Sequence, residues 1–212
     1  MPPTLDEEWS LCTQGYALVA GLDEVGRGCW AGPVVAAAVV LPMDRLRLEP
    51  DLLAGVDDSK RLSARRREAA AGRVWEVALG VGIGLASPAL VDALGIVGAT
   101  RLAMRRALGQ LPLVPDFLLV DGLLRLSLSW PQRALVHGDA RCLSIAAASV
   151  VAKVHRDALM RGWAADYPAY GFAQHKGYGT PQHARALAHC GPCPLHRRSF
   201  APVARRLSAG SR

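Results

Sequence analysis

Residues 17–28 read ALVAGLDEVGRG, an apolar run that ends in two adjacent carboxylates and a glycine-rich turn. The run predicts a strand over residues 17–23, and the glycines after it predict a tight turn. Charge at the end of a buried strand is costly unless it is paired or bound to a metal ion. Open α/β sheets bind their ligands at the carboxyl ends of strands. Asp23 and Glu24 therefore indicate a ligand site at the end of this strand.

Two more carboxylates occupy similar places further along the chain. Asp121 ends the apolar run of residues 116–121, and Asp139 follows Gly138 shortly before a long predicted helix. Unpaired carboxylates repel one another, so a cluster of the four implies bound cations, and oxygen-only ligands favour Mg²⁺ or Mn²⁺. Two such ions about 4 Å apart can hold the attacking and leaving oxygens of a phosphodiester. Taken singly, each of the three aspartates is more typical of a helix cap or a turn.

The remaining sequence alternates strand-like and helix-like segments, an order that predicts an α/β layered domain with a mixed sheet. We expect one folded domain over residues 17–203, a flexible lead-in over residues 1–16 and a disordered basic tail over residues 204–212. Strands are expected over residues 17–23, 33–41, 77–86 and 116–121, short extended segments over residues 126–130 and 134–136, and helices over residues 63–76, 88–108, 143–163 and 181–189.

Composition and charge narrow the classes of function. The chain has 212 residues, of which 51% are hydrophobic, which is enough to build one domain core. A net charge of +7 favours a polyanionic partner, although a chain rich in Arg and Ala can also reflect genomic base composition. The N-terminus lacks the plan of a signal peptide, and the uncharged runs are too short to span a membrane. Five cysteines, an odd count, favour a reducing cytoplasm.

One cysteine motif suggests a different kind of site. Cys190 and Cys193 are spaced as in a thioredoxin-like redox motif, but they follow a predicted helix close to the chain end rather than a strand. His189, Cys190, Cys193 and His196 could alternatively ligate zinc. A turn that ends a helix explains the same residues, and we prefer that interpretation.

Seven motifs, in this order, resemble those of the bacterial type 2 ribonucleases H (ribonuclease HII). The resemblance extends from about residue 17 to about residue 203. The motifs are GLDEVGRG (21–28) with AGPVVAAA (31–38), DSKRLS (58–63), VDG (120–122), GD (138–139), SIAAASVVAKV (144–154) with Arg156-Asp157, HKGYGT (175–180) and HRRSF (196–200).

The resemblance implies a ribonuclease H-like fold, with a mixed central sheet flanked by helices and a small helical C-terminal extension. It implies hydrolysis of the RNA strand of RNA–DNA hybrids and cleavage 5′ to single ribonucleotides embedded in duplex DNA, leaving 3′-hydroxyl and 5′-phosphate ends. Asp23, Glu24, Asp121 and Asp139 would be the catalytic residues and would bind two divalent ions, Mg²⁺ or Mn²⁺. We expect a monomeric, cytoplasmic enzyme whose partners are these nucleic acids and no membrane.

The resemblance also assigns the substrate-binding residues. Gly26, Arg27 and Gly28 would meet the ribose, whose 2′-hydroxyl distinguishes RNA from DNA, and glycine permits the close backbone approach. Tyr178 would stack on the sugar of the next, deoxy nucleotide. Lys60 and the basic side of the long helix, with Lys153, Arg156 and Arg161, are candidates for phosphate contacts. His137 departs from the pattern, because the family usually has Lys there.

Two other classes compete with this interpretation. A nucleic-acid-binding module without catalytic activity would explain the charge, but it would gain nothing from carboxylates next to phosphate. A type 3 ribonuclease H carries an extra N-terminal domain, for which a first motif at residue 21 leaves no space.

Overall fold

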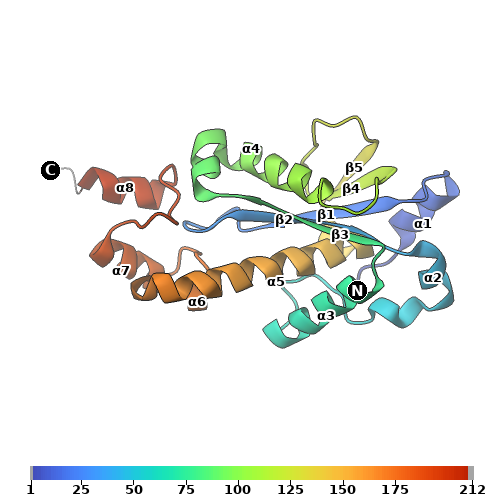
Figure 1. Ribbon diagram of the computed structural model, residues 1–212, viewed down its shortest axis with the longest axis horizontal. Coiled ribbons are helices and arrows are strands. Elements are labelled where there is room, and N and C mark those ends of the chain that lie inside the picture. The colour runs from blue at the N-terminus through green and yellow to red at the C-terminus, as the bar shows by residue number, and fades with distance from the viewer. Residues whose placement is uncertain (1, 210–212) are drawn as a thin grey trace.

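The computed structural model describes residues 2–209, which build a five-stranded mixed sheet in the order β3-β2-β1-β4-β5 (Figure 1). The first three strands pair antiparallel, whereas β4 and β5 run parallel to β1. The mixed sheet and its flanking helices confirm the predicted fold class. The strands are β1 (Val19–Val25), β2 (Val34–Val40), β3 (Gly80–Ala86), β4 (Phe117–Asp121) and β5 (Gln132–Leu135).

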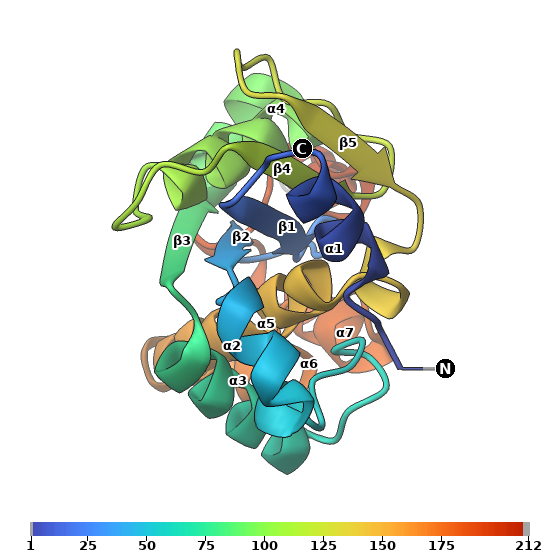
Figure 2. The ribbon, with the colours of Figure 1, turned by 90° about the vertical axis from the view of Figure 1, so that its right-hand side faces the viewer.

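Helices cover both faces of the sheet. Figures 1 and 2 show α4 (Pro88–Leu108) on one face and α5 (Leu143–Asp166) with α3 (Ala64–Val77) on the other. Every residue of β2 is buried between these two layers, which explains its continuous apolar sequence. Ser63 and Ser87 accept hydrogen bonds from the first turns of α3 and α4, so both expected helix starts are confirmed.

Close packing explains the small residues of both layers. A Cβ atom on Gly21 of β1 would lie 2.2 Å from the carbonyl carbon of Ser144, so only glycine lets β1 approach the start of α5. On the other face, a Cβ on Gly82 would lie 2.0 Å from the carbonyl oxygen of Ala107 in α4. The sheet is therefore clamped between two helices at backbone contact.

The expected flexible lead-in is wrong. Residues Asp6–Thr13 form helix α1, in which Glu8 and Leu11 are buried. The Glu8 carboxylate accepts a hydrogen bond of 2.7 Å from the backbone N–H of Ser144, near the start of α5. Only one apolar side chain of α1 is buried, so its periodicity is too weak to predict a helix.

Two further short helices follow β2, namely α2 (Met43–Leu48) and η1 (Pro50–Leu53).

The C-terminal part is more ordered than expected. It contains η3 (Pro168–Tyr170), α6 (Phe172–His175), α7 (Pro181–Cys190) and α8 (Ala201–Ala209). The disordered tail expected from residue 204 is wrong as far as Ala209, because α8 continues to that residue; positions 210–212 lie outside the described residues. Val203 is buried and joins α8 to the rest of the chain.

One expected extended segment is also absent. Residues 126–130 do not pair with a strand; instead the Gln132 side chain bonds both the N–H and the carbonyl of Leu126, at 2.7 and 2.8 Å. Over residues 2–209, no helix is long and apolar enough to cross a bilayer. The cytoplasmic location stays a prediction.

Candidate active site

Strand pairing brings the first two aspartates together. Leu22 of β1 lies opposite Val120 of the parallel strand β4, so the residues that follow, Asp23 and Asp121, lie side by side. The expected end of the first strand at residue 23 is wrong, because β1 continues to Val25 and Asp23 still pairs with β2. Asp121 Oδ1 accepts hydrogen bonds from the backbone N–H groups of Gly138, at 2.7 Å, and of Asp139, at 3.4 Å. These bonds anchor the short helix η2 (Gly138–Ala140), which carries Asp139.

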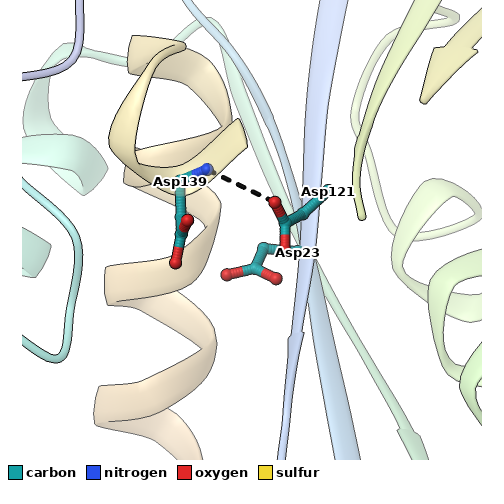
Figure 3. A group of neighbouring side chains, drawn as sticks. All are labelled: Asp23, Asp121 and Asp139. Atoms are coloured by element: carbon teal, nitrogen blue, oxygen red, sulfur yellow. Dashed lines mark hydrogen bonds between the residues drawn. The ribbon is translucent and has the colours of Figure 1, made fainter. Parts of the chain in front are cut away.

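The three aspartates form one cluster (Figure 3). A carboxylate oxygen of each of Asp23, Asp121 and Asp139 lies within 4.8 Å of the other two. Within residues 2–209, no other His, Cys, Asp or Glu group of three or more converges in this way, and the alternative zinc set around Cys190 therefore does not form. Three carboxylates without nitrogen or sulfur ligands fit a hard divalent cation such as Mg²⁺ or Mn²⁺.

Glu24 stands apart from this cluster. Its carboxylate accepts a hydrogen bond from Arg27 Nη1 at 3.1 Å and does not converge with the aspartates. Burial raises the pKa of Glu24, while Arg27 opposes that rise. Glu24 nevertheless lines the same cavity as Asp23 and Asp121.

Burial, and after it mutual repulsion, determines the electrostatics of the cluster. Burial raises the pKa of Asp23 well above its usual value, and the charges of Glu24 and Asp121 raise it further. The backbone N–H of Glu24, which donates to Asp23 Oδ1 at 2.7 Å, and the nearby polar hydroxyl of Ser149 oppose the rise without cancelling it. Burial, then the charge of Asp139, also raises the pKa of Asp121. Like charges in a poorly solvated place attract a cation.

Lys60 supplies the nearest positive charge. Its Nζ atom lies 2.8 Å from Asp139 Oδ2, and 78% of its side chain is exposed. Burial tends to lower the pKa of Lys60, but the hydrogen bond and charge of Asp139 outweigh this effect and raise it. The neighbouring Ser59 accepts a hydrogen bond of 2.9 Å from Ser149 on α5, which holds this loop against the site.

Two buried arginines support the glycine-rich turn from beneath. Arg197 donates to the carbonyl oxygens of Gly26, at 2.7 Å, and Arg27, at 2.8 Å, and Arg156 donates to that of Pro33, at 2.9 Å. Gly26 has φ +90°, and a Cβ there would lie 2.2 Å from Arg156 Nε. A Cβ on Gly28 would meet nothing within 4 Å, so this glycine faces open space. Gly28 is thus free for close approach, whereas Gly26 is required by the fold.

The expectation that Arg156 contacts phosphate is wrong, because its side chain is fully buried. Ser149, Ala152, Arg156 and Met160 lie on one buried stripe of α5, and this spacing could have revealed it. Arg197 was likewise not identified from the sequence as a supporting residue, although this residue lies in the HRRSF motif.

Tyr178 forms another wall of the site. Its side chain is 39% exposed, and Lys153 Nζ lies 5.6 Å from the ring centroid. Burial raises the pKa of Tyr178 to about 12, and the nearby Cys29 thiol raises it further. One cavity of about 230 Å³ contains nearly all the predicted side chains; its lining includes Asp23, Glu24, Gly26, Arg27, Lys60, Asp121 and Tyr178. A larger cavity of about 770 Å³, beside α1 and α2, has no such carboxylate cluster.

Comparison with known proteins identifies the family. The sequence model described as Ribonuclease HII matches residues 20–203. The chain belongs to the ribonuclease HII family. Ribonuclease HII of Chloroflexus aurantiacus is 57% identical over 203 residues, covering 96% of this chain and 95% of the relative. That of Chloroflexus aggregans is 56% identical over 204 residues, covering 96% and 95%.

Solved structures agree with the fold. The ribonuclease H2 from Pyrococcus horikoshii superposes with a TM-score of 0.78 at 24% identity, covering 92% of this chain and 99% of that one. The ribonuclease HII in a PCNA complex from Archaeoglobus fulgidus gives 0.71 at 27% identity, covering 86% and 95%. As a ribonuclease HII, the chain is an endonuclease and a hydrolase that acts on RNA–DNA hybrids, and its family depends on divalent metal. The alternatives of a non-catalytic binding module and a type 3 enzyme are therefore wrong.

Proposed function

We propose that this ribonuclease HII cleaves 5′ to single ribonucleotides embedded in duplex DNA as well as within RNA–DNA hybrids, leaving 3′-hydroxyl and 5′-phosphate ends. The observation that carries this proposal is the convergence of Asp23, Asp121 and Asp139 at a cavity that is also lined by the glycine-rich turn, through Gly26 and Arg27, and by Tyr178. The three aspartates can hold metal, and the turn and the tyrosine can meet a ribose and its neighbour.

We assign the metal-binding role to Asp23, Asp121, Asp139 and Glu24. Two bound divalent ions, Mg²⁺ or Mn²⁺, would supply Lewis-acid stabilisation of charge at the attacking and leaving oxygens. The charges of Glu24 and Asp121 both act on Asp23, and Asp121 also anchors the turn that carries Asp139. Glu24 joins the set when its carboxylate leaves Arg27, a partner on the surface side of the cavity.

Lys60 exchanges partners in this scheme. Its ammonium group holds Asp139, as a bound cation would, and its long exposed side chain can swing away at little cost. Once displaced from Asp139, the ammonium group is positioned to contact a phosphate at the rim of the cavity. This exchange keeps the site less repulsive before metal and substrate bind.

Recognition of the ribose follows from the turn and the tyrosine. Arg197 and Arg156 hold the turn rigid, so Gly28 presents its backbone at a fixed place. An aromatic face can stack on a sugar or base, and Tyr178 lines the cavity. Because one chain supplies the whole lining of the cavity, we propose that the enzyme acts as a monomer.

The decisive experiment uses three duplexes of one sequence: a single embedded ribonucleotide, a continuous RNA–DNA hybrid and all-DNA. Each is incubated with Mg²⁺, Mn²⁺ or EDTA. We expect one cut 5′ to the embedded ribonucleotide, cleavage of the hybrid, and neither reaction in EDTA or on DNA. Product ends are identified by polymerase extension of the 3′-hydroxyl and by phosphatase-sensitive mobility of the 5′-phosphate. Hybrid cleavage alone would disprove the proposed junction activity.

A further inference from the structure

Three histidines lie buried beneath the Tyr178 loop and do not line the acidic cavity. They are His175 at the end of α6, His183 in the first turn of α7, and His196 in the segment before α8. The rings of His175 and His183 stack with centroids 4.4 Å apart, and Nε2 of His183 lies 3.0 Å from Nε2 of His196. Nothing in the proposed chemistry uses these rings.

Their partners determine where each hydrogen lies. The backbone N–H of Cys193 donates to Nδ1 of His196 at 3.0 Å, so this nitrogen carries a lone pair and the hydrogen of neutral His196 is on Nε2. Nδ1 of His183 lies 2.9 Å from the carbonyl oxygen of Tyr178, which can only accept, so His183 carries its hydrogen on Nδ1. His196 Nε2–H must therefore donate to His183 Nε2.

The result is a directed chain of hydrogen bonds from Cys193 through His196 and His183 to the backbone of Tyr178. A proton added to His183 Nε2 would face the Nε2–H of His196, and a proton added to His196 Nδ1 would face the N–H of Cys193. Only one arrangement of hydrogens therefore satisfies every bond of the chain. We call these two histidines the histidine relay.

Neighbouring contacts leave Tyr178 little other freedom. Nδ1 of His175 accepts a hydrogen bond from the backbone N–H of Gly177 at 3.1 Å. The carbonyl oxygen of Gly177 accepts one from the backbone N–H of Trp30 at 2.9 Å. A Cβ on Gly179 would lie 2.3 Å from the Trp30 ring, so the chain passes that ring at contact distance. The loop is thus held on both sides of Tyr178, and His183 holds the carbonyl of Tyr178 itself.

We infer that His183 and His196 are positioning residues for Tyr178, and that the histidine relay sets the place of the Tyr178 ring at the substrate and thereby the preference for an embedded ribonucleotide over a continuous hybrid. This inference rests on the proposed role of Tyr178. His196 does not line the cavity, and the hydrogen-bonded route from its ring to Tyr178 runs through His183.

The test compares two substitutions of His196. His196→Gln keeps an N–H donor that can reach His183, whereas His196→Phe keeps a ring but removes both hydrogen bonds. The readout is the ratio of kcat/KM on the single-ribonucleotide duplex to that on the hybrid. We expect His196→Phe to lower this ratio about three- to tenfold, in line with the loss of one or two neutral hydrogen bonds, and His196→Gln to restore most of it. An equal slowing of both substrates by His196→Phe would mean that the relay has only a structural role and would overturn the inference.

A double-mutant cycle separates this inference from the function on which it rests. If Tyr178→Ala leaves the ratio unchanged, the proposed role of Tyr178 is wrong. If Tyr178→Ala lowers the ratio, His196→Phe should have no further effect on it in the Tyr178→Ala background. A full additional loss there would overturn the relay.

A measurement on the unaltered protein covers the case in which the Phe variant does not fold. Nitrogen-15 NMR of the histidine rings distinguishes the two neutral tautomers. We expect the hydrogen on Nδ1 in His183 and on Nε2 in His196. The opposite tautomer in either ring would break the chain of donors and overturn the inference.

Discussion

The acidic cluster and the histidine relay both gather buried ionisable groups from separate elements of the chain, yet they are built in opposite ways. In the acidic cluster, burial and neighbouring charges raise the pKa values of Asp23 and Asp121. In the relay, burial lowers the pKa values of His183 and His196 to about 4, so both rings are neutral and satisfy each other's hydrogen bonds.

This difference distinguishes a ligand-binding site from residues that support the fold. Groups that satisfy one another stabilise the fold and need nothing from outside. Groups that repel one another in a poorly solvated place weaken the fold unless a ligand offsets the repulsion, and here the ligand that fits is a divalent cation. Tyr178 connects the two regions, because its ring lines the acidic cavity while its carbonyl is held by His183.

The largest expected effect is on the acidic cluster. Asp121→Asn removes one ligand charge but keeps an oxygen that can accept from Gly138 and Asp139. We expect kcat on an RNA–DNA hybrid to fall by at least about a hundredfold, with duplex binding retained, because metal ions supply much of the transition-state stabilisation. Asp116→Asn is the matched control just before the same strand, where the carboxylate bonds only the backbone of residues 17 and 18. Near-normal turnover in Asp121→Asn would mean that this residue only forms a turn.

Next in size is the contact of Tyr178 with the substrate. Aromatic stacking is worth about 1–3 kcal/mol, so Tyr178→Ala should lower kcat/KM on a single embedded ribonucleotide by roughly tenfold or more. Tyr178→Phe should cost less, because it loses only the hydroxyl. Both should affect the embedded ribonucleotide more than a long hybrid, where many registers are available. Equal slowing of both substrates, with a parallel fall in melting temperature, would show that Tyr178 only supports its loop.

The pH dependence of stability tests the other half of the comparison. His183 and His196 titrate near 4 when folded and near 6.5 when unfolded, so the unfolded chain binds more protons between these values. The free energy of unfolding should therefore fall as pH drops from 6.5 to 4.5, by roughly 2 kcal/mol for each ring. Urea melts in EDTA at both pH values measure it. A His183→Phe/His196→Phe variant should show a smaller fall in the free energy of unfolding. An unchanged fall would mean that other groups bind the protons that destabilise the protein.

A smaller effect of opposite sign is expected from the acidic cluster without metal. Burial and then repulsion by Glu24 and Asp121 raise the pKa of Asp23, and Asp23→Asn removes the charge that both effects penalise, so it should raise the free energy of unfolding in EDTA at pH 8 by about 1 kcal/mol. The same variant should lose the stabilisation that Mn²⁺ gives the parent protein. Destabilisation in EDTA would show that the carboxylate is satisfied by the protein itself.

The smallest effect is expected at the cysteine pair. Cys190 is exposed and Cys193 is half-buried, and neither joins a converging metal-ligand group. Cys193 takes part in the relay through its backbone N–H, which donates to His196 Nδ1 and is retained in serine. A Cys190→Ser/Cys193→Ser variant should cleave both substrates at the parent rate and contain no zinc. Stoichiometric zinc in the parent, lost together with folding in the variant, would contradict this.

Much of this architecture could be predicted from local patterns. The strands at residues 19–25 and 34–40 and the long helices follow from apolar periodicity and from capping residues such as Ser63 and Ser87, because these act over a few residues. The acidic residues were recognisable because charge at the end of an apolar run is costly wherever the run is buried. The weak helices α1 and α8 were missed, since each depends on distant contacts, such as that of Glu8 with Ser144.

What the sequence by itself determined is which family the chain resembles, which residues are candidates for the chemistry, and where most strands and long helices lie. Only the tertiary structure decided that Asp23 meets Asp121, because this requires β4 to pair parallel with β1 across nearly a hundred residues of chain. It also decided that Arg156 turns inward and that His183 meets His196. Side-chain type states what a group can do, whereas burial and partners, which arise from packing between distant elements, determine whether it binds substrate or holds the fold together.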